Sequence, residues 1–251
     1  IALNVTGTGQ LLGIGAAPSA TLKTTVISGS GGSASTGRIA GNAGDAIATQ
    51  AALADTITLN VTGSGLISGL PIGMFANATS GFGGFAGNQV TGTLGQVRGG
   101  QITANVEGNG RIESDLTFTA NASQELVDPP AAPTGLAAYG VGEADSVAGT
   151  ININVRNAAA TGTAPQINGS ISATADAYVA TIGTPGAGMT TNGLVQGGTI
   201  GLNVTNGGVI AQGTAPTAPA ITLNARASGA FGTRTLAGGS AIGGTISFDV
   251  D

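Results

Sequence analysis

The chain contains no cysteine, histidine or tryptophan. Without histidine or cysteine, the Ser/His and Cys/His nucleophile systems and the usual zinc sites are excluded. The absence of cysteine also removes disulfides and thiol chemistry, and it is compatible with export. Carboxylate chemistry is the one catalytic route that remains. We predict that the chain is not an enzyme and has no catalytic, cofactor or metal-binding residues.

Charge is also scarce, with 8% charged residues and a net charge of −5. No apolar run reaches the roughly 18 residues that cross a bilayer, so we expect no membrane span. The chain begins at Ile1 without methionine or a visible signal peptide, as a processed product or a fragment would. The basic residues are scattered singly and form no stripe for phosphates, so we expect no nucleic-acid partner. These are Lys23, Arg38, Arg98, Arg111, Arg156, Arg226 and Arg234.

Glycine and small apolar residues dominate what is present: 46 of 251 residues are glycine and 41% are hydrophobic. That apolar content is too high for a disordered chain, and the glycines keep no three-residue period, which excludes collagen. No stretch keeps apolar residues at helical spacing over three turns. The composition therefore predicts an all-β structure with a narrow interior.

One phrase recurs along the chain, as IALNV, ITLNV, ITANV, ININV, IGLNV and ISFDV. The intervals between its copies are 56, 45, 49, 49 and 46 residues. Such periods are typical of solenoids, propellers or arrays. The copies begin at Ile1, Ile57, Ile102, Ile151 and Ile200, with a partial sixth repeat from Ile246.

The phrase alternates apolar and polar residues, which is the pattern of a strand with one buried face. We therefore expect Ile57, Leu59 and Val61 to point inward, with Thr58 and Asn60 outward. The same assignment predicts that Ile200, Leu202 and Val204 are buried and that Asn203 faces away from them.

A second phrase follows the first in every full repeat, and its later inward positions are often alanine. A glycine-rich passage then leads to a small turn, such as RGGQI or QGGTI, where we expect positive φ and close backbone approach. The proline-rich segment from Glu125 is expected to be a protruding loop. The second phrases begin at Leu22, Ile72, Leu116, Ile171 and Ile221.

These repeats predict one elongated domain over residues 1–251, in which copies stack so that Ile packs on Ile and Val on Val. If each repeat supplied two rungs of about 25 residues, about ten rungs would give a ladder about 48 Å long. One polar position of the phrase is shared by asparagines, whose amides could hydrogen-bond along the stack. They are Asn4, Asn60, Asn105, Asn154 and Asn203, with Asp249 in the sixth copy.

The pattern GGTIxLNVxGxGxI, then ITLNAxASG, then a Gly/Ala-rich stretch ending in GGT resembles the repeats of large bacterial surface adhesins. These are similar to filamentous haemagglutinin and autotransporter passengers. The resemblance covers nearly the whole chain and implies a β-solenoid, specifically a right-handed parallel β-helix of about five repeats of ~49 residues. It also implies export to the cell surface and a structural or adhesive role. The irregular repeat lengths and the proline-rich loop depart from that pattern.

Two other arrangements remain open. The two phrases could pair as antiparallel hairpins in a β-sandwich or β-prism, or a fibre subunit could donate Ile1–Thr8 to a neighbour's sheet. In a solenoid, IALNV and ISFDV would both be unpaired edges, which aggregate unless they are capped. We therefore predict a segment of a longer solenoid or a subunit that stacks head to tail.

Three candidate surfaces have simpler interpretations. The acidic residues Glu107, Glu113, Asp115, Glu125, Asp128, Glu143 and Asp145 could form a paired-carboxylate or Ca²⁺ site, but a solvated acidic loop is favoured. N-x-S/T occurs at Asn4, Asn60, Asn77, Asn121, Asn168 and Asn203, and a ladder is favoured over glycosylation. Threonine pairs at Thr56/Thr58 and Thr117/Thr119 are too scattered to suggest ice binding.

The sequence thus predicts a non-enzymatic structural protein of an extracellular bacterial fibre, biofilm component or adhesin stalk. Its partners would be further copies of itself and, as an adhesin, host or surface glycans. The alternatives are a pilus-like subunit joined by strand exchange and a carbohydrate-active β-helix enzyme.

Overall fold

The computed structural model describes residues 1–28, 46–47, 55–80, 85–86, 89–90, 95–124, 145–157, 163–179, 194–211, 220–228 and 240–251. Every regular element in these ranges is a β-strand. The strands form four mainly parallel sheets, and β8 (Phe85–Ala86) pairs antiparallel with β9 (Gln89–Val90). The all-β prediction is confirmed for this part of the chain.

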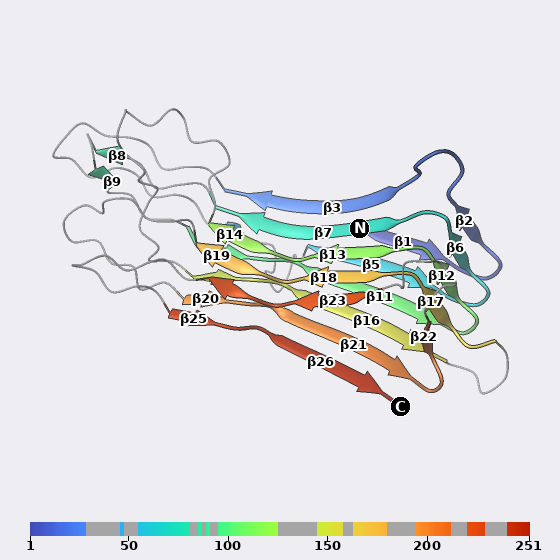
Figure 1. Ribbon diagram of the computed structural model, residues 1–251. Helices are drawn as coiled ribbons and strands as arrows, with labels where there is room; N and C mark the ends of the chain where they lie inside the picture. Colours follow the sequence, from blue (N-terminus) through green and yellow to red (C-terminus); the bar gives the residue numbers. More distant parts are fainter. Residues whose placement is uncertain are drawn as a thin grey trace.

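Sheet I contains all six copies of the first phrase, side by side and parallel (Figure 1). Its register matches the sequence alignment residue by residue, so that Ile57, Ile102, Ile151, Ile200 and Ile246 are successive partners. The strands are β1 (Ala2–Val5), β5 (Thr56–Val61), β11 (Gln101–Glu107), β16 (Thr150–Arg156), β21 (Thr199–Thr205) and β26 (Thr245–Val250).

Sheet II consists of three-residue strands. In the first, second, third and fifth repeats these strands follow a tight turn after the first phrase. Gly63 and Gly108 adopt positive φ in this turn, which glycine tolerates because it has no Cβ. The strands are β2 (Gln10–Leu12), β6 (Leu66–Ser68), β12 (Arg111–Glu113), β17 (Gln166–Asn168) and β22 (Val209–Ala211).

Sheet III contains the second phrase. In later repeats the phrase is divided into two short strands, both of which continue the ladder from β7. In the first repeat Ala20, and not Leu22, is the partner of Ile72, so the predicted start there is wrong by two residues. The strands are β3 (Ala20–Ile27), β7 (Ile72–Thr79), β13 (Leu116–Thr119), β14 (Ala122–Gln124), β18 (Ile171–Thr174), β19 (Ala177–Val179), β23 (Ile221–Asn224) and β24 (Ala227–Ser228).

Sheet IV precedes each return to sheet I. Its strands are β4 (Ala46–Ile47), β10 (Val97–Arg98), β15 (Ser146–Val147), β20 (Leu194–Gln196) and β25 (Ser240–Ile242). The turn that follows is Gly-Gly or, after β15, Ala148-Gly149, and it lies under a neighbouring backbone: a Cβ on Gly149 would be 1.9 Å from the carbonyl oxygen of Gly100. Close approach is therefore confirmed at this turn, but positive φ is not, because Gly99, Gly100 and Gly149 do not adopt it.

One repeat forms one layer of the four sheets, so the case of two rungs per repeat does not apply. The described strands of the first phrase pair with one another, and those of the second phrase do likewise, always in parallel. The short sheet II strand and its turn reverse the chain between them, so the two phrases face each other across the core. Antiparallel hairpins between the phrases do not form in the described strands. Six strands span about 24 Å, half the expected length.

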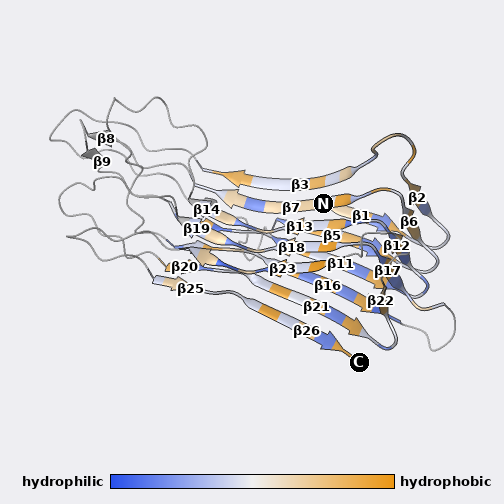
Figure 2. Cartoon of the chain, in the orientation of Figure 1, coloured by the Kyte–Doolittle hydropathy of each residue, from blue (hydrophilic) through white to orange (hydrophobic). Residues whose placement is uncertain are grey.

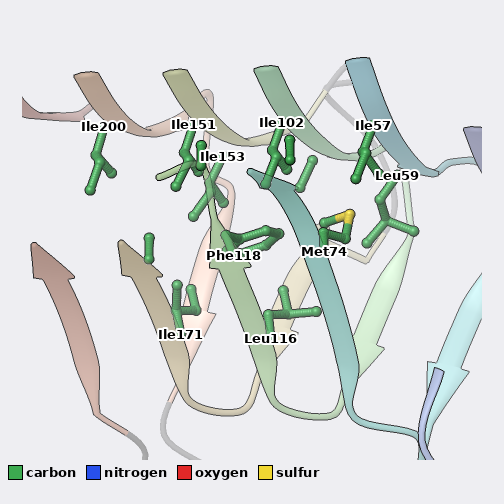
Figure 3. Packing of buried hydrophobic residues seen from close by; sticks show 14 of the residues in the cluster. Ile57, Leu59, Met74, Ile102, Leu116, Phe118, Ile151, Ile153, Ile171 and Ile200 are labelled. Carbon is green, nitrogen blue, oxygen red and sulfur yellow. The ribbon is translucent and has the colours of Figure 1, made fainter. Parts of the chain in front are cut away.

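The core lies between sheets I and III. Ile57, Ile102, Ile151 and Ile200 form one row of buried side chains, and the side chains of facing strands approach them (Figure 3). The alternation of buried and partly exposed residues confirms the predicted strand face, with Leu59 fully buried. Figure 2 shows hydrophobic and hydrophilic segments following one another along β21 and β26. The other predicted core residues, Val61, Leu202 and Val204, are also buried.

Candidate assembly site

A continuous asparagine ladder lies on the outer face of sheet I. Each amide nitrogen Nδ2 donates to the Oδ1 of the preceding copy, at 2.7 Å from Asn60 to Asn4 and 2.9 Å from Asn105 to Asn60. The bonds from Asn154 to Asn105 and from Asn203 to Asn154 are both 2.8 Å. The predicted ladder is thus confirmed for five copies, and it has one direction along the stack.

A second ladder lies on sheet III, at the position that separates β13 from β14. Here a side-chain oxygen accepts from the backbone nitrogen one repeat later: Asn121 N donates to Asn77 Oδ1 and Asp176 N to Asn121 Oδ1, both at 2.9 Å. Arg226 N donates to Asp176 Oδ1 at 2.8 Å. Sequence reasoning missed this backbone arrangement, and the recurring Asn or Asp in the second phrase was its available signal.

The N-x-S/T asparagines are therefore mostly held in ladders. Asn4, Asn60 and Asn203 belong to the amide ladder, and Asn77 and Asn121 accept backbone hydrogen bonds. The remaining one, Asn168, is partly exposed at the end of β17, opposite Ala211. The favoured ladder interpretation is correct for five of the six positions.

The third-repeat acidic residues do not converge. Glu113 lies on sheet II, where it pairs with Arg111 and accepts a 3.1 Å hydrogen bond from Ser68 Oγ. Asp115 Oδ1 accepts from Ser170 N at 2.7 Å. Glu107 lies on sheet I, next to Arg156 in the register. The three carboxylates therefore lie beside different partners and form no shared site.

The rest of the acidic group is only partly described. Asp145 Oδ1 accepts from Leu194 N at 3.0 Å, one repeat away, while Glu125, Asp128 and Glu143 lie outside the described residues, as does the predicted proline-rich loop. Within the described ranges, no group of three metal-ligating side chains comes together. The same ranges contain no helix able to cross a membrane.

The outer threonines do not form a regular array. The column that contains Thr58 continues with Thr103 and then changes to Asn152, Gly201 and Ser247. On sheet III, Thr117 lies between Gly73 and Ser172. The outer face of sheet I is therefore polar and varied in shape.

The inward apolar side chains of sheet I are more exposed at the C-terminal end of the stack than at the N-terminal end. At the C-terminal end, the inward residues of β26 are exposed, with Ile246 at 42%, Phe248 at 59% and Val250 at 71%. At the N-terminal end, Val5 of β1 is buried and Leu3 is partly buried against the core, while Ile1 is 56% exposed. Ile221, at an inward position of sheet III, is also exposed, whereas Val209 and Ile242 are exposed in outward columns next to Gln166 and Gln196.

The exposed inward side chains of Ile221, Ile246, Phe248 and Val250 form an apolar end face. It combines exposed side chains with the free backbone groups of the edge strand β26, and such an edge is a template for another strand. Comparisons of the chain with protein-family models, curated proteins and solved structures found no match.

Proposed function

We propose that the chain is a β-solenoid, a right-handed parallel β-helix with one turn per ~49-residue repeat, and that it serves as a non-enzymatic structural segment of a bacterial fibre or adhesin stalk. The fibre is extracellular and extends end to end, by covalent continuation or by head-to-tail stacking of copies. The observation that carries this proposal is the unbroken register of sheet I, in which six copies of one phrase stack with their apolar residues in columns.

The physical logic is that of a linear repeat protein. Each layer contacts its neighbours through the same apolar columns and the same amide ladder, so adding a layer repeats an interface that already exists. The apolar end face lacks such a neighbour in the single chain. A further repeat layer, from continuation of the same polypeptide or from the N-terminal layer of another copy, would bury it, and a head-to-tail contact that does not close on itself produces a filament.

The carbohydrate-active alternative has less support. A glycosidase of the usual kind needs two carboxylates facing one substrate position. Glu113 and Asp115 instead bind Arg111, Ser68 and Ser170. No described acidic pair is arranged for such a reaction. We assign the low charge and the dense ladders to a structural role.

The proposal is tested by imaging the purified chain at increasing concentration. We expect rods that lengthen with concentration, with an axial spacing of about 4.8 Å in fibre diffraction. Val250→Lys should stop the lengthening, because it places a charge on the apolar end face. Thr117→Lys, on an exposed position of a middle strand, is the matched control and should lengthen normally. Compact monomers at high concentration, with no such spacing, would contradict end-to-end assembly.

A further inference from the structure

Phe75 is an aromatic side chain on the outer face of sheet III. It occupies an outward position of β7, between the buried Met74 and Ala76, and it is partly exposed. Its ring lies over Gly73, because a Cβ built on Gly73 would be 2.6 Å from Phe75 Cε2 and 3.0 Å from Cζ. The ring therefore fills the space that a side chain at position 73 would take, and it lies along the strand on the surface of the sheet.

Threonine hydroxyls flank this ring on both sides. In the register, Gly73 lies between Thr21 of β3 and Thr117 of β13, and both threonines are exposed. Thr119 is the partner of Phe75 on β13. Neighbouring strands are about 4.8 Å apart, so the hydroxyls border the ring directly. A matching ligand offers an apolar face to the ring and hydrogen-bonding groups at its edge.

One cation adjoins the ring. Lys23 of β3 is the register partner of Phe75 on the side opposite Thr119, and it is exposed. Within the described ranges, no carboxylate forms an ion pair with Lys23. Its positive charge is therefore available to an anionic group of a ligand that covers the ring.

We propose that this surface binds an acidic polysaccharide, that is, a polymer of sugars that carry carboxylates, such as a uronic acid polymer. The binding surface, called the Phe75 surface, consists of Thr21, Lys23, Phe75, Thr117 and Thr119. The C–H face of one sugar packs on the phenyl ring, and its hydroxyls hydrogen-bond with the threonines. The sugar carboxylate accepts a charge-assisted hydrogen bond from the ammonium of Lys23. This inference rests on the proposed adhesin-stalk function and names its ligand class.

A protein partner matches the Phe75 surface less well. The energy of protein interfaces is concentrated in clusters of large anchoring side chains. Here the ring is bordered by Gly73 and threonines instead of further large apolar residues. A ligand built of small rings with many hydroxyls fits this mixture better. The outer face of sheet I has no aromatic side chain on its described strands, so the same contact is absent there.

Binding is tested by calorimetric titration of the full chain with tetramers of galacturonate, glucuronate and mannuronate. We expect at least one of these acids to bind, and Phe75→Ala to weaken its binding by about tenfold. Phe75→Leu should weaken it similarly, because leucine still covers Gly73 but has no flat ring. Gly73→Ala keeps the phenyl group but displaces it from the sheet, so it should also weaken binding. Circular dichroism confirms that each variant is folded.

The role of charge is tested by comparing each acid with its methyl ester. Lys23→Gln should weaken binding of the acid by about tenfold and leave binding of the ester unchanged. Added salt should weaken binding of the acid as well. Arg156→Gln is the matched control, since it removes an exposed cation from sheet I, and it should bind like the native chain.

Three results overturn the inference: no binding of any of the three acids at about 1 mM, unchanged binding by Phe75→Ala, or equal affinity of the native chain for acid and ester. If Phe75→Leu binds like the native chain, the ring only shields the backbone of Gly73, and the inference is again wrong. Rods that lengthen with concentration but bind no sugar would leave the proposed fibre intact. Compact monomers that bind the acid through Phe75 would contradict the fibre alone.

Discussion

The strands β16 and β26 carry the same phrase, yet their inward side chains lie in opposite environments. Ile151 and Ile153 are fully buried, whereas the equivalent Ile246 and Phe248 are exposed. Local sequence does not explain this difference, because both strands keep the same alternation and the same register in sheet I. The cover supplied by the other three sheets decides burial, so each repeat depends on its neighbours for stability.

The largest difference in unfolding free energy between a covered strand and β26 is expected from a buried charge. Leu59→Asp places an unpaired carboxylate in a dry core, and we expect it to lower the free energy of unfolding by more than about 4 kcal/mol. Phe248→Asp, at the equivalent position of β26, should cost less than about 1 kcal/mol, because its side chain is in contact with water. Urea denaturation of dilute monomer measures both.

The outward face provides a control for that pair. Thr58→Asp lies next to Leu59 but points away from the core, and we expect a mild effect. Equal losses for Leu59→Asp and Thr58→Asp would contradict the assigned strand face. Equal losses for Leu59→Asp and Phe248→Asp would mean that β26 is covered in the monomer.

A smaller contrast is expected from truncating isoleucine. Ile151→Ala removes buried methyl groups between two covered layers and should cost about 2–5 kcal/mol, because the surrounding strands cannot close the cavity. Ile246→Ala should cost less than about 1 kcal/mol. Thermal unfolding at low protein concentration compares the two, and a greater loss for Ile246→Ala would contradict the comparison.

The glycine turns provide the next contrast. Gly149→Ala would place its Cβ 1.9 Å from the carbonyl oxygen of Gly100, so the layers must separate there, and we expect a loss of about 1–3 kcal/mol. Gly243→Ala meets open space and should change stability by less than about 0.5 kcal/mol. Protease resistance of the two variants provides the measurement. Equal resistance would show that the turn relaxes without cost.

The sequence predicted the first phrase well because its period of two specifies both strand face and register once six copies are aligned. The one-layer repeat was not predicted, since the three-residue strand at Leu66–Ser68 is too short to show a period. The wrong start at Leu22 has a related cause: Ala20 and Leu22 lie on the same face, and only pairing with Ile72 distinguishes them.

The candidate assembly site was also predicted in part. The amide ladder follows from one recurring position, and its direction emerges only from the donor and acceptor atoms of Asn60 and Asn4. The acidic group of Glu107, Glu113 and Asp115 looked compact in sequence, but the turn after β11 separates Glu107 on sheet I from Glu113 on sheet II, and Asp115 lies between β12 and β13.

The smallest contrast concerns the amide ladder itself. Asn105 donates to Asn60 and accepts from Asn154, so Asn105→Ala leaves two partly buried amide groups without their partners. We expect a loss of about 1–2 kcal/mol, because each net hydrogen bond is worth about 1 kcal/mol. Asn4→Ala removes one bond at an exposed end and should cost about half as much. Denaturation midpoints at equal m-values compare the two variants. Equal losses would contradict the prediction, because they would mean that the second hydrogen bond of Asn105 adds nothing to stability.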